Sequence, residues 1–172
     1  SLSQDVQGEV CDYPEEFFKE RIHTIRRSRP DDFQIKEAAE LIKKSKKPII
    51  ISGGGVFYSD ATEELSAFAQ KHNIPVTQTV MGYSTMKKDH SHYLGVIGGL
   101  GGKAANNLSK ETDTAIAIGT KLADFTTGSW ANFENPDFKL VSINAARFDA
   151  SKHMAQAIVG DAKVSLMELS QA

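Results

Sequence analysis

The sequence predicts an α/β protein of three layers (α/β/α), with a parallel sheet between two layers of helices. Short apolar runs without polar alternation recur along the chain, which is typical of strands buried on both faces of a sheet. Segments with helical spacing of apolar residues alternate with these runs, as crossovers between parallel strands require. The chain has 172 residues, 40% hydrophobic and 24% charged, which is enough for one domain with its own core.

The regular elements begin after residue 30. Asp31 or Asp32 can cap a first helix, which ends at Pro48 after a group of lysines that the helix dipole favours. Asp60 or Thr62 begins a second helix. The other predicted elements are helices over 102–111 and over 162–170, the latter capped by Asp161, and buried strands over 48–51, 74–79, 113–120, 138–145 and 155–161.

The first 30 residues differ from the rest of the chain. The stretch "CDYPEEFFKERIHTIRRSRP" is rich in charges and aromatic residues and has no strand pattern. Its arginines, Arg26, Arg27 and Arg29, could bind phosphate, but a solvated or interdomain face is the favoured interpretation. We therefore predict a linker segment over 1–30 and a Rossmann-like domain over 31–172.

Composition argues against several classes of partner. A net charge of −2 provides no basic field for nucleic acid, and no apolar run approaches the roughly 20 residues that span a bilayer. The N-terminal stretch lacks the pattern of a signal peptide. The single cysteine, Cys11, cannot form an intrachain disulfide, which favours a cytoplasmic protein.

Glycine-rich loops follow several of the predicted strands, where parallel sheets bind their ligands. Glycines let backbone N–H groups approach a phosphate closely. The motifs are incomplete, however: Tyr58 stands at the third small position of a dinucleotide fingerprint begun at Gly53, and no clear strand precedes Gly99. A nucleotide site and tight turns without a ligand therefore remain alternatives. The loops are SGGGV (52–56), GVIGGLGGK (95–103), GTKLADF (119–125) and NAARFD (144–149).

No catalytic or metal-ligating residue is predicted. His90 and His92 fit a solvent-exposed turn, since no further ligand stands at the spacing that a metal site needs. Trp130, Phe133 and Phe125 are expected to form an apolar cluster, as an interface or a core patch. The residues alone thus indicate a binding scaffold without catalytic machinery.

Five stretches stand in order over about 31–172: "KKPIIISGGGVFYSDATEEL", "NIPVTQTVMG", "DHSHYLGVIGGLGGKAAN", "DTAIAIGTKLADFTT" and "IVGDA". Together they resemble the central domain of thiamine-diphosphate-dependent enzymes. Three more stretches are "CDYPEEFFKERIH", "DFTTGSW" and "FDASKH". These resemble, within that group, the trihydroxycyclohexane-dione hydrolases of myo-inositol catabolism.

This resemblance implies a Rossmann-like sheet of about six strands and a three-domain parent enzyme that opens a cyclic dione by hydrolysis of a carbon–carbon bond. Thiamine diphosphate and Mg²⁺ would be bound by flanking pyrimidine- and diphosphate-binding domains, and the full-length enzyme would form a homo-oligomer. The middle stretch itself would be inactive.

The resemblance also implies a possible FAD or ADP site in the central domain. Lys121 stands where an arginine is common and Asn144 where an acidic residue often binds ribose, so we expect the glycines to keep inherited geometry without an occupied site. The residues carried over by position are Gly53, Gly54, Gly55, Gly98, Gly99, Leu100, Gly101, Thr120, Lys121 and Asn144.

Overall fold

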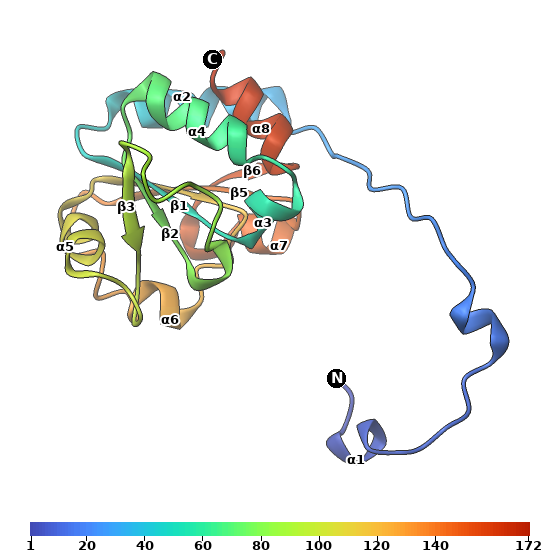
Figure 1. The fold of residues 1–172 in the computed structure, drawn as a ribbon. Coiled ribbons are helices and arrows are strands. Elements are labelled where there is room, and N and C mark those ends of the chain that lie inside the picture. Colours follow the sequence, from blue (N-terminus) through green and yellow to red (C-terminus); the bar gives the residue numbers. More distant parts are fainter.

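A six-stranded parallel sheet forms the centre of the protein (Figure 1). The computed structural model describes residues 1–172. The strands lie in the order β3-β2-β1-β4-β5-β6, which is the order of Rossmann folds, so the predicted sheet is confirmed. The strands are β1 (Pro48–Ser52), β2 (Val76–Gln78), β3 (Tyr93–Val96), β4 (Thr114–Ile118), β5 (Lys139–Asn144) and β6 (Gln156–Val159).

Helices cover both faces of this sheet. Helices α2, α4 and α8 pack together on one face, and α5 lies on the other (Figure 1). The α-helices are α1 (Gln4–Gln7), α2 (Asp32–Lys44), α3 (Gly54–Tyr58), α4 (Thr62–His72), α5 (Lys103–Glu111), α6 (Asp124–Thr127), α7 (Arg147–Ala150) and α8 (Ala162–Leu169). The 3-10 turns are η1 (Glu15–Phe18), η2 (Val80–Gly82) and η3 (Lys152–Met154).

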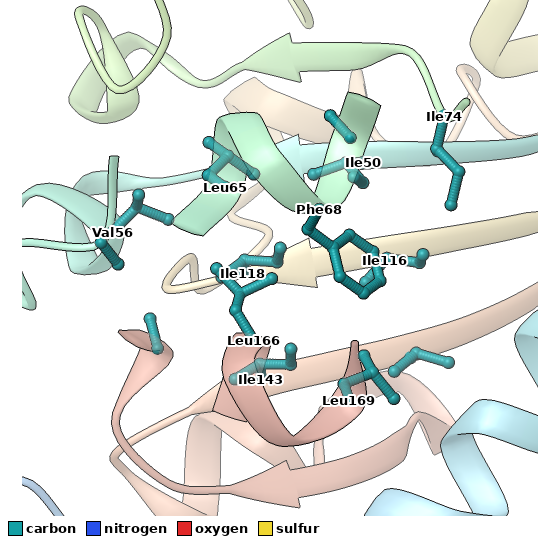
Figure 2. Close-up of a cluster of buried hydrophobic side chains, with 14 of the residues drawn as sticks. Ile50, Val56, Leu65, Phe68, Ile74, Ile116, Ile118, Ile143, Leu166 and Leu169 are labelled. Carbon is teal, nitrogen blue, oxygen red and sulfur yellow. The ribbon is translucent and has the colours of Figure 1, made fainter. Parts of the chain in front are cut away.

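The central strands are apolar throughout because both of their faces are buried. Successive side chains of a strand point to opposite faces. Ile50 belongs to the larger cluster with Leu65 and Phe68 of α4 (Figure 2), whereas Ile49 and Ile51 belong to a second cluster on the other face. The lack of polar alternation in the sequence has this origin.

Most of the predicted elements are confirmed, including all five strands. The side chain of Asp31 accepts hydrogen bonds from the first turn of α2, and that of Asp161 does the same for α8. Of the two alternatives for the second helix, the structure has α4 beginning at Thr62. The predicted helices over 102–111 and 162–170 correspond to α5 and α8.

The prediction that no clear strand precedes Gly99 is wrong, because β3 ends at Val96. Its four residues are only half-buried, at the edge of the sheet, and Gly95 within it has φ +101°. The strand therefore lacks the buried apolar run that marks the others. Helix α3 was also not predicted, because it opens on two glycines, which disfavour helix.

Residues 1–29 are all exposed and extend away from the sheet and its helices (Figure 1). Two of the three arginines attach the end of this arm to α8. Arg27 Nη1 lies 3.0 Å from Asp161 Oδ2 and also contacts the carbonyl of Ser59, and Arg29 pairs with Glu168. All three contacts are to groups of the protein itself. None of the helices combines the length and apolar character needed to cross a membrane.

Candidate functional site

The candidate site is a crevice at the carboxyl ends of β1 and β4. From these two neighbouring strands, the chain adds strands β2 and β3 on one side and β5 and β6 on the other, and parallel sheets bind ligands at such a point. Two loops meet there closely. Gly53 N donates to Ile118 O (2.8 Å) and Gly55 N to Gly119 O (2.9 Å). A Cβ atom on Gly53 would lie 2.4 Å from Gly119 O, and one on Gly55 would lie 2.6 Å from Gly119 Cα. Glycine is therefore required at both positions by the close approach of the two backbones.

The crevice has a volume of about 420 Å³. Four of the residues predicted to bind a cofactor line it: Gly54, Gly55, Thr120 and Lys121. Gly53 lies beside the crevice, in contact with the β4 loop. The other lining residues were not predicted individually. Ile97, Gly119, Ala123 and Phe125 lie in two of the predicted glycine loops, whereas Tyr58, Thr79, Val80, Met81 and Thr126 lie outside these loops.

Backbone amides give the crevice its polar character. The N–H groups of Gly54, Thr120 and Lys121 donate no hydrogen bond within the chain. The Lys121 side chain adds a positive charge to the same wall. An anion the size of a phosphate or carboxylate is the group that such donors suit best.

The second glycine loop, residues 98–101, does not line the crevice. Its N–H groups are already engaged: Gly98 N donates to Asn106 Oδ1 (2.9 Å), Gly99 N to Phe125 O (2.9 Å) and Gly101 N to Gly98 O (2.8 Å). The remaining residue, Leu100, is exposed. This loop thus uses its glycines to fold against α6, and three of its four amides are not available to a phosphate.

Asn144 also has its side chain engaged within the fold. Its Oδ1 accepts a hydrogen bond from Ala146 N (3.0 Å), and its Nδ2 donates to Thr120 O (3.3 Å). The carboxamide therefore links the loops after β4 and β5. It does not lie in the lining of the crevice.

The predicted aromatic cluster forms only in part. Trp130 packs with Phe133 (ring centroids 5.5 Å apart), with Phe138 and with His153 (4.5 Å). Phe125 is separate from it and lines the crevice, so including Phe125 was wrong. The stretches "DFTTGSW" and "FDASKH", distant in sequence, meet at the contact between Trp130 and His153.

The histidines of the "DHSHY" stretch lie near each other, with ring centroids 5.6 Å apart. His92 Nε2 is 3.0 Å from Asn73 Oδ1, and His92 N donates to His90 Nδ1. No group of three or more His, Cys, Asp or Glu side chains lies close enough together to hold a metal ion. These contacts tie the turn before β3 to the end of α4.

Comparison with known protein families decides what kind of domain this is. The model of the thiamine pyrophosphate enzyme central domain matches residues 35–169. The chain belongs to this family.

Relatives of this central domain are considerably longer than the chain. It is 47% identical over 169 residues to the 3D-(3,5/4)-trihydroxycyclohexane-1,2-dione hydrolase of Clostridium perfringens, and 45% identical over 168 residues to the corresponding hydrolase 1 of Bacillus cereus. Each alignment covers 98% of this chain and 26% of the relative. The chain thus spans about a quarter of the length of these curated relatives.

A solved structure supports the fold of the central domain. The benzoylformate decarboxylase of Polynucleobacter necessarius superposes with a TM-score of 0.68 at 22% identity, covering 94% of this chain and 30% of that one. At this identity, the likeness concerns the fold alone.

The residues of this central domain do not fit thiamine diphosphate with Mg²⁺. At Gly160-Asp161-Ala162 a carboxylate that could bind a metal ion follows a glycine directly. However, the Asp161 carboxylate already accepts hydrogen bonds from Lys163 N (3.0 Å) and Val164 N (3.3 Å), and it pairs with Arg27. It therefore serves to cap a helix and to attach the arm.

Proposed function

We propose that this chain is the central, structural domain of a thiamine-diphosphate-dependent hydrolase that opens the ring of a trihydroxycyclohexane-1,2-dione. The observation that carries the proposal is the 47% identity over 98% of the chain to a protein of that name. In this reaction water adds across the dione and a ring carbon–carbon bond breaks. Thiamine diphosphate supplies the nucleophilic carbon and the electron sink for such cleavage.

In this proposal, segments outside this chain bind the cofactor and Mg²⁺. The linker over 1–30 joins the domain over 31–172 to a pyrimidine-binding domain, and a diphosphate-binding domain follows. The full-length enzyme is a cytoplasmic homo-oligomer without nucleic-acid or membrane partners. The arm's exposed apolar residues, among them Phe17, Phe18 and Ile22, support this role, because flanking domains would cover them.

A chimera tests the proposed reaction. The matching quarter of the Clostridium perfringens hydrolase is replaced with residues 1–172 of this chain, and release of the ring-opened product is measured. Retention of dione hydrolysis is expected. A chimera that folds and binds thiamine diphosphate but does not turn over the dione would contradict the assignment.

Calorimetry tests the structural role. Titration of the chain with thiamine diphosphate and Mg²⁺ is expected to give no binding heat, because Asp161 is engaged within the fold. Saturable binding would show that the domain has a cofactor site of its own.

A nucleotide-binding module, as in relatives of acetolactate synthase, is the second candidate. The free amides of Gly54, Thr120 and Lys121 in the crevice favour it. The engaged side chain of Asn144 and the engaged amides of Gly98, Gly99 and Gly101 weigh against it. A thermal-shift assay with FAD, ADP and NAD decides, since ligand at 100 times its Kd adds roughly 2.7 kcal/mol of stability. The leading proposal expects no shift.

A further inference from the structure

A second, smaller cavity lies beside the end of β2. Its volume is about 270 Å³, below the usual range for drug-sized ligands, so it suits a molecule of a few heavy atoms. One lining residue belongs to β2, and the others come from the segment that follows turn η2. The lining residues are Gln78, Tyr83, Ser84, Met86, Lys87 and Lys88.

The carboxamide of Gln78 lies in this cavity with one half of its hydrogen-bonding capacity unused. The residue is 1% exposed. Its Nε2 donates to Thr85 Oγ1 and to Met86 O, both at 3.1 Å, whereas its Oε1 accepts no hydrogen bond from the chain. Two unpaired polar atoms of the chain are fully enclosed, Glu64 Oε2 and Ser165 Oγ, and Gln78 Oε1 is not one of them. Since Gln78 lines the cavity, its Oε1 is open to the cavity. A buried acceptor of this kind calls for a donor from outside.

A buried network holds the carboxamide in this orientation. Thr85 Oγ1 donates to Gly82 O (2.7 Å) and lies 2.8 Å from Ser52 Oγ. Both Thr85 and Ser52 are fully buried. Since Met86 O can only accept, the amide nitrogen must face it and the oxygen must face the cavity.

The other polar groups of the cavity are cationic. The nine salt bridges of the chain leave Lys87 and Lys88 without an acidic partner. Lys88 Nζ lies 5.2 Å from the centroid of the Tyr83 ring, and the neighbouring Tyr83 side chain raises the pKa of Lys88. Both lysines can therefore pair with an anion from outside the chain.

We propose that this cavity binds a small hydroxycarboxylate, whose hydroxyl donates to Gln78 Oε1 and whose carboxylate pairs with Lys87 and Lys88. The site is independent of the proposed ring-opening reaction and of the crevice. A neutral polyol would leave the lysines unpaired, and an acid without a hydroxyl would leave the Gln78 oxygen unpaired. The site thus prefers ligands that have both groups.

Three probes of similar size test this preference: D-glycerate, propionate, which lacks the hydroxyls, and glycerol, which lacks the charge. Binding to residues 1–172 is followed by NMR, using the shift of the Gln78 side-chain amide. We expect saturable binding of D-glycerate, with propionate and glycerol each weaker by roughly 3- to 10-fold, the worth of one hydrogen bond or exposed ion pair. No saturable binding of D-glycerate, or equal binding of all three, would overturn the proposal.

Variants assign the two contacts. Gln78→Met is expected to abolish the preference for D-glycerate over propionate, as read from backbone amides around the cavity, whereas Lys88→Met weakens both acids equally. Lys36→Met, which removes a lysine of α2 far from the cavity lining, is the control and changes neither. If Gln78→Met does not fold, Gln78→Glu keeps the volume and is expected to reject both acids by charge repulsion. Retention of the preference in Gln78→Met, or unweakened binding in Gln78→Glu, would refute the assigned role of Gln78.

Discussion

Replacing Gly55 with alanine tests the close approach of the β1 and β4 loops. The added Cβ would lie 2.6 Å from Gly119 Cα and 3.0 Å from Gly119 O, and both of these atoms are backbone, which cannot rotate away as a side chain can. Overpacking of this kind costs about 1–3 kcal/mol, and the better helix propensity of alanine offsets about 0.5–1 kcal/mol of it. We expect a net loss of about 1 kcal/mol in the free energy of unfolding, which lowers Tm by about 2–4 °C in a chain of this size.

The assay is thermal unfolding followed by circular dichroism, with Gly8→Ala as the control. A Cβ at Gly8 would come no closer than 3.4 Å to another atom, and the φ of −89° at this residue suits alanine. A Tm for Gly55→Ala within a degree or so of the wild type, or an equal loss in Gly8→Ala, would refute the steric reasoning.

Two further predictions concern carboxylates that accept backbone hydrogen bonds within the fold. Asp161→Ala should lower the free energy of unfolding by about 1 kcal/mol through loss of the α8 cap. Asp161→Asn keeps the cap but not the charge that pairs with Arg27, so it should lower the free energy of unfolding by less. A larger loss in the asparagine variant, measured by urea unfolding, would contradict this. At Asp113, burial acts to raise the pKa, but hydrogen bonds from Ser45 Oγ, Lys46 N and Lys47 N outweigh it, so the pKa of Asp113 is lowered. Because the pKa of Asp113 is lower in the folded state, its charged form stabilises the fold at pH values above the unfolded-state pKa. The stability advantage of the wild type over Asp113→Asn should therefore be full at neutral pH and shrink below about pH 4. A gap that stays constant with pH, measured by urea unfolding across the acid range, would rule out this linkage.

The sequence predicts the sheet well because the buried strands obey a simple rule. Ile49, Ile50 and Ile51 must be apolar when helices cover both faces, and this pattern is visible without a structure. The same rule does not detect the edge strand β3, because its residues are only half-buried and Gly95 interrupts the apolar run. The local signals for caps, at Asp31 and Asp161, were equally reliable because the capping bonds span only two or three residues.

The site was less predictable, because it depends on contacts between distant loops. The glycine pattern singled out Gly54 and Gly55, which line the crevice, but it could not show that the amides of Gly98 and Gly99 are used against other parts of the fold. Phe125 was predicted beside Trp130 because the two are near in sequence, yet it lines the crevice. A possible signal was the position of Val80 and Met81 directly after a predicted strand, which places them at the carboxyl edge with the glycines.

The arm's attachment to α8 brings the two ends of the folded unit to one corner. Arg29 pairs with Glu168, and Pro30 lies against Gly160, so the polypeptide enters the fold next to the helix that completes it. A unit whose entry and exit are neighbours can be spliced into a longer chain, or exchanged between chains, without stretching the segments on either side. This geometry suits a domain that lies between flanking domains of a longer chain.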